Sequence, residues 1–214
     1  MIIVPTATLA RDATVAAGFS RIPAMYGYTL YPAPKSIYYA ALTFTPFFEA
    51  SFAMVKPDQL PDRPLHVGDR TATVKLRLWP ESRRRPALAI GSHDFFNLKW
   101  LGLVKPGRKL PENFAALYAV ATKSFKPSFF HQLVIHLGYG TDWLPAVQNY
   151  LKGPFGGVEL FLRKEVAVMA ESDARWVNVG ARLRLWSHLQ GYVNWMDGRE
   201  LCGGVGLSVA LGEL

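Results

Sequence analysis

The chain has 214 residues, half of them hydrophobic and only 19% charged, a balance that fits one domain more apolar than most soluble domains. The longest uninterrupted apolar run, residues 114–121, is far too short for a membrane-spanning helix, so helical membrane proteins are excluded. The formal net charge of +8 indicates an anionic partner but does not choose among nucleic acid, lipid phosphate and acidic polysaccharide.

Alternation of apolar and polar residues is the dominant pattern of the chain, in segments separated by Pro, Gly, Asp and Asn. In 177–185, apolar residues at odd positions alternate with Asn178, Gly180, Arg182 and Arg184. The pattern predicts strands at 13–21, 37–45, 48–55, 71–79, 86–93, 114–123, 129–140, 155–163, 166–171, 176–186, 189–196 and 201–211. We therefore expect an all-β fold in which residues 1–214 form a single closed antiparallel transmembrane β-barrel of about twelve strands.

The connections between these strands alternate in length. Those at 46–47, 80–85, 124–128, 164–165 and 187–188 are tight, whereas 22–36, 56–70, 94–113 and 141–154 are long. Short turns at one end and long loops at the other are typical of outer-membrane barrels. The alternation weakens at the end of the chain, where 172–175 and 197–200 are both short.

Periodicity alone does not separate a membrane barrel from a soluble barrel, which hides its apolar face inside. The polar faces carry Lys75, Arg77, Arg182 and Arg184, and a dry interior has little with which to satisfy such charges. We therefore expect a wet lumen and a lipid-facing apolar surface. Aromatic residues near strand ends, such as Trp79, favour interfacial girdles over ordinary core packing.

Seven charged residues on the polar strand faces are candidates for the lumen: Lys75, Arg77, Arg182, Arg184, Glu49, Glu159 and Glu171. Guanidinium and carboxylate groups across a narrow lumen would pair and plug the barrel. The surplus of cations in the set would instead favour the passage of anions. Both alternatives stay open at this point.

Two basic segments are candidates for contact with a partner. One is the tip formed by Arg83, Arg84 and Arg85, and the other contains Lys99, Lys105, Arg108 and Lys109. They are either solvated loops or contacts for lipopolysaccharide and other outer-membrane lipids, for an anionic polysaccharide, or for other envelope proteins. Nucleic acid is not expected as a partner, because the aromatic stacking platform for bases is absent from the pattern.

The sequence does not favour an enzyme. Ser92, His93 and Asp94 are consecutive at the end of the predicted strand 86–93, and neighbours on a strand face opposite sides and cannot converge as a triad. The same parity separates His131 from His136, so no metal is expected, and no motif indicates a cofactor. An outer-membrane hydrolase that uses Ser92 or His93 with residues of another strand remains a weaker alternative.

The order of several short segments resembles the YjbH-type outer-membrane β-barrel proteins linked to exopolysaccharide production. These segments are 6–12, Gly18-Phe19-Ser20-Arg21-Ile22-Pro23, 86–95, 118–123, 138–140, Gly156-Gly157-Val158-Glu159 and 170–173. The resemblance implies a bacterial outer-membrane location and a part in making or exporting surface polysaccharide, with no catalytic residues to carry over. The opening residues lack a secretory signal, so an exported protein would need a signal peptide upstream of Met1.

Two functions follow from these observations. The first is a pore or export-associated component of the outer membrane that passes or guides an anionic surface polysaccharide. The alternative is a plugged structural barrel that docks partner proteins of a larger envelope assembly through the long loops 56–70 and 94–113.

Overall fold

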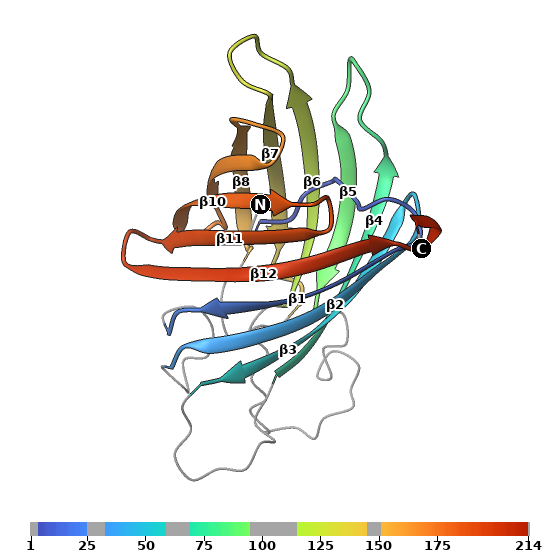
Figure 1. Cartoon of the computed structure of the whole chain (residues 1–214). Coiled ribbons are helices and arrows are strands. Elements are labelled where there is room, and N and C mark those ends of the chain that lie inside the picture. Colours follow the sequence, from blue (N-terminus) through green and yellow to red (C-terminus); the bar gives the residue numbers. More distant parts are fainter. Residues whose placement is uncertain (1–3, 25–32, 59–68, 95–114, 145–150, 214) are drawn as a thin grey trace.

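A computed structural model of the chain describes residues 4–24, 33–58, 69–94, 115–144 and 151–213. It contains β1 (Thr14–Ile22), β2 (Lys35–Thr45), β3 (Phe48–Pro57), β4 (Asp69–Trp79), β5 (Ala87–His93), β6 (Ala116–Phe125), β7 (Gln132–Thr141), β8 (Gly153–Phe161), β9 (Val166–Ser172), β10 (Val177–Leu185), β11 (Leu189–Met196) and β12 (Glu200–Ala210), with a short 3-10 helix η1 (Leu211–Glu213) after the last strand. Each strand pairs antiparallel with the next in sequence, and β1 pairs with β12 to close the barrel (Figure 1).

This arrangement confirms the predicted closed antiparallel fold of twelve strands. The strand bounds differ most at β7, which begins at Gln132 and leaves Phe129 and Phe130 in the preceding turn. No helix in the described ranges is long and apolar enough to cross a membrane, a finding that does not bear on crossing by strands.

The two ends of the barrel differ in their connections. The short-turn rim is formed by 46–47, 80–86, 126–131, 162–165 and 186–188, and both the start of β1 and the end of β12 lie there. At the opposite end, called the long-loop rim, lie the strand ends that are joined in sequence by 23–34, 58–68, 94–115, 142–152, 173–176 and 197–199. The predicted alternation of short and long connections is therefore present, and it weakens in the last two connections of the long-loop rim.

The seam between β1 and β12 depends on a pair of glycines. Gly18 pairs with Gly206 across this seam. The ring of Tyr39, on the adjacent strand β2, lies over both glycines on the inner face, and a Cβ added at Gly18 would come within 2.5 Å of that ring. A side chain at either position would therefore displace Tyr39 from the interior.

Apolar side chains form the outer surface of the barrel. Every strand exposes at least one large apolar side chain, for example Val15, Tyr38, Phe52, Leu76, Ile90, Phe125, Leu137, Val158, Val168, Val179, Val193 and Val205. The buried polar side chains of the strands include Thr43, Thr122, His136, Asn178 and Asn194, which alternate with the exposed apolar positions. The structure thus turns the apolar face outward and the polar face inward.

A segment before the first strand fills part of the interior. Residues 4–13 cross the inside of the barrel before β1 begins, and their blue trace runs within its outline in Figure 1. Val4 and Ala7 pack into a buried cluster with Ala87 and Ala89 of β5, Tyr118 and Val120 of β6, Phe155 of β8, and Leu151. The small alanines of β5 make room for this segment.

Candidate functional site: the barrel interior and its basic rim

An ion pair crosses from β10 to β8 inside the barrel. Arg182 Nη2 lies 2.7 Å from Glu159 Oε2, and the side chains are only 19% and 6% exposed. The guanidinium of Arg182 also lies 5.4 Å from the centre of the Phe161 ring, at cation–π distance. At this separation the two groups form a charge-assisted hydrogen bond that links β8 and β10 across the inner face of β9.

A second pair holds the N-terminal segment. Lys75 Nζ lies 3.0 Å from Glu49 Oε1 and donates a hydrogen bond of 3.1 Å to the carbonyl oxygen of Thr8. On the other side of the segment, the backbone N–H of Val4 donates to Glu171 Oε2 at 3.4 Å. Two of the candidate lumen charges therefore bind backbone groups of the segment and fix it across the interior.

The remaining two candidates lie nearer the short-turn rim. Arg77 Nη2 donates to the carbonyl oxygen of Pro46 in the β2–β3 turn. Arg184 lines a cavity at the end of β10. All seven residues occupy positions of the inward-facing strand register, but they form separate pairs and contacts rather than one continuous charged ring.

Sequence reasoning missed the polar contact at the centre of the segment. The backbone N–H of Ala7 donates to Thr122 Oγ1 at 2.8 Å, and this hydroxyl lies 2.9 Å from His136 Nδ1. The hydroxyl thus joins the backbone of the segment to the imidazole, because it can accept from Ala7 and still form a second hydrogen bond with His136. The sequence around Thr122 and His136 gives no sign that Ala7, 115 residues before Thr122, binds there.

Ser92 and His93 make hydrogen bonds to different groups. The Ser92 hydroxyl donates to the carbonyl oxygen of His93 at 3.3 Å, whereas His93 Nδ1 lies 3.1 Å from Thr73 Oγ1. The His93 ring also lies 5.3 Å from the ring of Tyr118. Among the described residues no group of three or more His, Cys, Asp or Glu side chains is placed to hold a metal ion.

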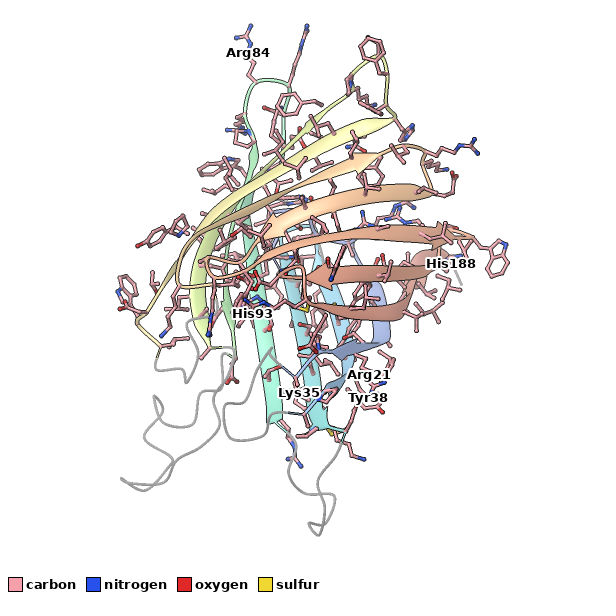
Figure 2. The ribbon with its side chains drawn as sticks, turned by 90° about the vertical axis from the view of Figure 1, so that its left-hand side faces the viewer. Arg21, Lys35, Tyr38, Arg84, His93 and His188 are labelled. Carbon is pink, nitrogen blue, oxygen red and sulfur yellow. The ribbon has the colours of Figure 1, made fainter. Side chains whose placement is uncertain are left out.

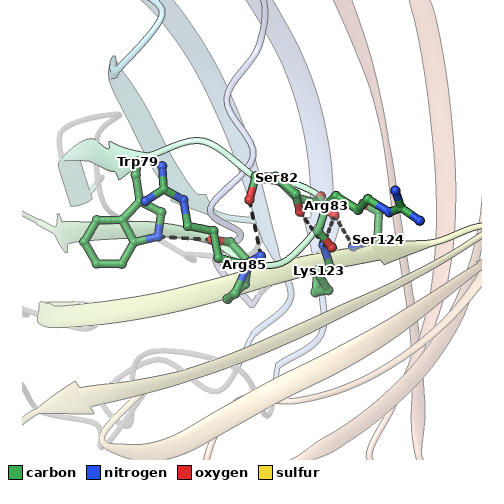
Figure 3. Close-up of polar contacts among 8 residues, drawn as sticks. Trp79, Ser82, Arg83, Arg85, Lys123 and Ser124 are labelled. Carbon is green, nitrogen blue, oxygen red and sulfur yellow. Dashed lines mark hydrogen bonds and ion pairs between the residues drawn. The ribbon is translucent and has the colours of Figure 1, made fainter.

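The backbone of the basic tip formed by Arg83, Arg84 and Arg85 is held in place by hydrogen bonds from Lys123 (Figure 3). Lys123 Nζ donates to the carbonyl oxygens of Ser82 at 2.6 Å and Arg83 at 3.2 Å. The three arginine side chains are exposed, and Figure 2 shows Arg84 projecting from the barrel at the end opposite Arg21, Lys35 and Tyr38. The tip therefore presents its positive charge to the surroundings while its backbone stays fixed.

Glu81 completes this support. Its Oε1 accepts a hydrogen bond of 2.9 Å from the backbone N–H of Ser124 and lies 3.2 Å from Lys123 Nζ. Partial burial raises the pKa of the Glu81 carboxyl, but the hydrogen bond from Ser124 and the charge of Lys123 outweigh it, and the pKa lies below its ordinary value. Glu81 is thus ionised at neutral pH. The second predicted basic segment, with Lys99, Lys105, Arg108 and Lys109, lies outside the described residues.

A comparison with protein-family models matches residues 1–165 to YjbH, described as exopolysaccharide biosynthesis protein YbjH. The match covers most of the chain. The chain belongs to the YjbH family. This confirms the resemblance seen in the sequence and links the β-barrel to a family named for exopolysaccharide biosynthesis. A comparison with curated proteins found no match.

Proposed function

We propose that this YjbH-family protein is a non-enzymatic β-barrel of the bacterial outer membrane that serves the production or export of surface polysaccharide. In this proposal residues 4–13 occlude its lumen. The single observation that carries the proposal is the combination of an apolar outer surface on every strand with an interior of polar and charged groups.

The outer surface supports a lipid environment because soluble monomers rarely expose apolar area on this scale. Exposed aromatic residues lie near both ends of the strands: Phe44, Phe47, Trp79 and Trp186 toward the short-turn rim, and Tyr38, Tyr139, Trp143 and Trp195 toward the long-loop rim. Two such bands are typical of transmembrane barrels, whose aromatic rings sit at the two membrane interfaces.

The interior supports occlusion over a permanently open pore. Val4 and Ala7 are buried against β5, β6 and β8, and backbone groups of the segment bind Glu171, Thr122 and Lys75. A second buried cluster of Ile22, Met196 and Cys202, with Ile37 and Trp176 packed against it, adds apolar contacts on the inner face near the long-loop rim. In this role the barrel docks other envelope proteins and contacts lipopolysaccharide, as a scaffold for the polysaccharide machinery.

Cell fractionation and purification test the membrane part of the proposal. We expect the protein in the outer-membrane fraction and expect that it needs detergent to remain monodisperse. A strain that lacks the protein should release less exopolysaccharide, and the wild-type gene should restore the yield. Recovery of a compact monomer without detergent would overturn the membrane location.

Planar-bilayer recording tests the occlusion. Protein whose insertion has been verified by flotation of proteoliposomes should show no sustained conductance. Sustained conductance of the full chain would contradict the occluded barrel and support the second candidate, a passage for an anionic polymer. The specific observation that favours this second candidate is the excess of cations over carboxylates among the seven interior charges.

A further inference from the structure

A cavity of about 490 Å³ opens at the short-turn rim, on the side of β10, β11 and β12. Its walls come from several parts of the chain that are distant in sequence: the end of the N-terminal segment, the β8–β9 turn, the β10–β11 hairpin and the end of β12. Its volume falls within the range of small-molecule binding sites in proteins. Glu171, Thr122 and Lys75, whose side chains bind the backbone of the N-terminal segment, do not line this cavity.

The charged side chains in the cavity lining are basic. The charged residues Arg11, Lys164 and Arg184 are among those that line it. Within the described part of the chain, its lining contains no aspartate or glutamate. A concave surface lined by one sign of charge concentrates ligands of the opposite sign, so this cavity favours an anion.

Neutral hydrogen-bonding groups lie beside the cations. Thr14, Ser187, Gln190 and Ser208 contribute hydroxyl and amide groups to the same lining. His188 Nδ1 lies 3.1 Å from the carbonyl oxygen of Ser208, and because a carbonyl only accepts, Nδ1 carries the proton of this bond. This contact orients the imidazole and leaves Nε2 as the ring nitrogen available for a further partner (Figure 2 labels His188 at the hairpin).

The hairpin that carries His188 has an unusual backbone. Trp186 and Ser187 have φ angles of 48° and 58°, the left-handed region that glycine and asparagine favour in tight hairpins. The Trp186 side chain is 80% exposed, whereas Ser187 lines the cavity. The strained turn thus places a tryptophan outside the barrel and a hydroxyl at the cavity.

We propose that this rim cavity binds carboxylate-bearing units of an acidic saccharide, an assignment that rests on the proposed role in polysaccharide production. Arginine and lysine bind the carboxylate, and the neighbouring hydroxyl and amide groups exchange hydrogen bonds with sugar hydroxyls. In outer-membrane barrels the short turns face the periplasm, so the cavity lies on the side from which an exported polymer arrives.

Titration of the full-length protein in detergent micelles tests the site. The probes are a trimer of galacturonic acid, the neutral trisaccharide maltotriose and inorganic phosphate, followed by isothermal calorimetry. We expect binding of the acidic trisaccharide in preference to the other two. The double variant Lys164→Gln with Arg184→Gln should weaken this binding roughly tenfold or more, because it removes charged hydrogen-bond donors from the cavity.

The matched control is Lys126→Gln with Arg163→Gln, which removes one lysine and one arginine from the same rim but outside the cavity lining. The control should bind the acidic trisaccharide like the wild type. Equal losses in the two double variants would overturn a specific site, as would equal affinity for maltotriose or phosphate, or no binding at all. If the first double variant does not fold, the single variant Lys164→Gln replaces it, because Lys164 lies exposed in a turn. Its affinity for the acidic trisaccharide should also fall.

The cavity assignment and the proposed function can be overturned separately. No binding by a protein that fractionates with the outer membrane and supports exopolysaccharide release overturns only the cavity assignment. Binding with the expected preference by a protein found outside the outer membrane overturns the proposed function and leaves the saccharide site standing.

Discussion

Arg182 illustrates how single charged residues are accommodated in this interior. Its partner Glu159 is nearly inaccessible to solvent, and the two side chains come from strands that are not neighbours in the sheet. A buried charge that loses its partner is costly, whereas an apolar pair of similar volume often costs little. The pair therefore makes opposite predictions for single and double substitutions.

Glu159→Gln should destabilise the barrel by about 2 kcal/mol, a value reduced from that of a fully buried pair because Arg182 retains some exposure. The double variant Glu159→Leu with Arg182→Met should recover most of that loss. Urea unfolding in detergent micelles, followed by tryptophan fluorescence, measures both. A single variant as stable as the wild type would show that the pair carries no stability.

Asp173 is a second residue whose environment has a measurable consequence. It lies in the β9–β10 connection and is 1% exposed, and its Oδ1 accepts hydrogen bonds from the backbone N–H groups of Trp176 at 2.7 Å and Arg175 at 3.0 Å. Burial raises the pKa of the Asp173 carboxyl, and although these hydrogen bonds lower it, the pKa stays above its ordinary value.

A carboxyl whose pKa is higher in the folded state binds its proton more tightly there, so protonation stabilises the fold. The contribution is present below the ordinary pKa of 3.8 and is lost as the pH rises through the raised pKa of the folded state. We expect the unfolding free energy of the wild type, relative to Asp173→Asn, to fall as the pH rises from about 3.5 to 7. A difference that stays constant over this range, or rises, would contradict the assignment.

At the scale of elements, the β10–β11 hairpin combines regular strands with a strained turn. The flanking pair Leu185 and Leu189 is in register, yet two of the three residues between them, Trp186 and Ser187, adopt positive φ. Non-glycine residues in such conformations cost stability unless the surrounding structure holds them. The sequence predicts a turn at 187–188 but does not indicate positive φ there, because the turn contains neither asparagine nor glycine.

Replacing Trp186 and Ser187 by Asn and Gly should therefore stabilise the hairpin by about 1 kcal/mol, because these residues adopt the turn without strain. Ser187→Ala, which keeps the positive φ in an L-residue, is the control and should bring no gain. Thermal unfolding monitored by circular dichroism measures the three proteins in one detergent. A loss of stability in the Asn-Gly variant would show that Trp186 contributes more by its contacts than its backbone costs.

The position of the N-terminal segment is the feature of the fold that the sequence predicted least. Residues 4–13 do not alternate like a strand, and Ala7 is a small residue in a polar stretch. In the structure Ala7 is fully buried because Ala87, Ala89 and Ala116 leave space for it inside the barrel. Only closure of the sheet creates this space, so no local pattern could predict that the segment would lie there.

At the scale of the whole molecule, the outward apolar surface makes the sharpest prediction. Val205 lies in the middle of β12 and is 53% exposed, and Leu162 lies in the β8–β9 turn and is 47% exposed. In water these two positions should respond alike to a charge. In a bilayer only the mid-strand position faces hydrocarbon, where lysine is costly.

We expect Val205→Lys to destabilise the barrel in lipid vesicles by about 2 kcal/mol and Leu162→Lys to have little effect. Reversible urea unfolding in the vesicles, followed by tryptophan fluorescence, provides the comparison. Equal effects of the two substitutions would indicate that the outer face of β12 does not contact hydrocarbon.

The sequence by itself determined the strands, their antiparallel order and the parity of their faces, because these follow from alternation and turn residues within short windows. It placed Arg182 and Arg184 on the face opposite Val179 and Leu183, and the structure keeps them there. The two-residue period does not say which face lies outside, because it is identical in a soluble and a membrane barrel. The charges on the polar faces predicted that the apolar face lies outside, and the tertiary structure places it there. The tertiary structure alone decided the pairing of Arg182 with Glu159, the path of residues 4–13 and the basic rim cavity, since each depends on residues that only the closed sheet brings together.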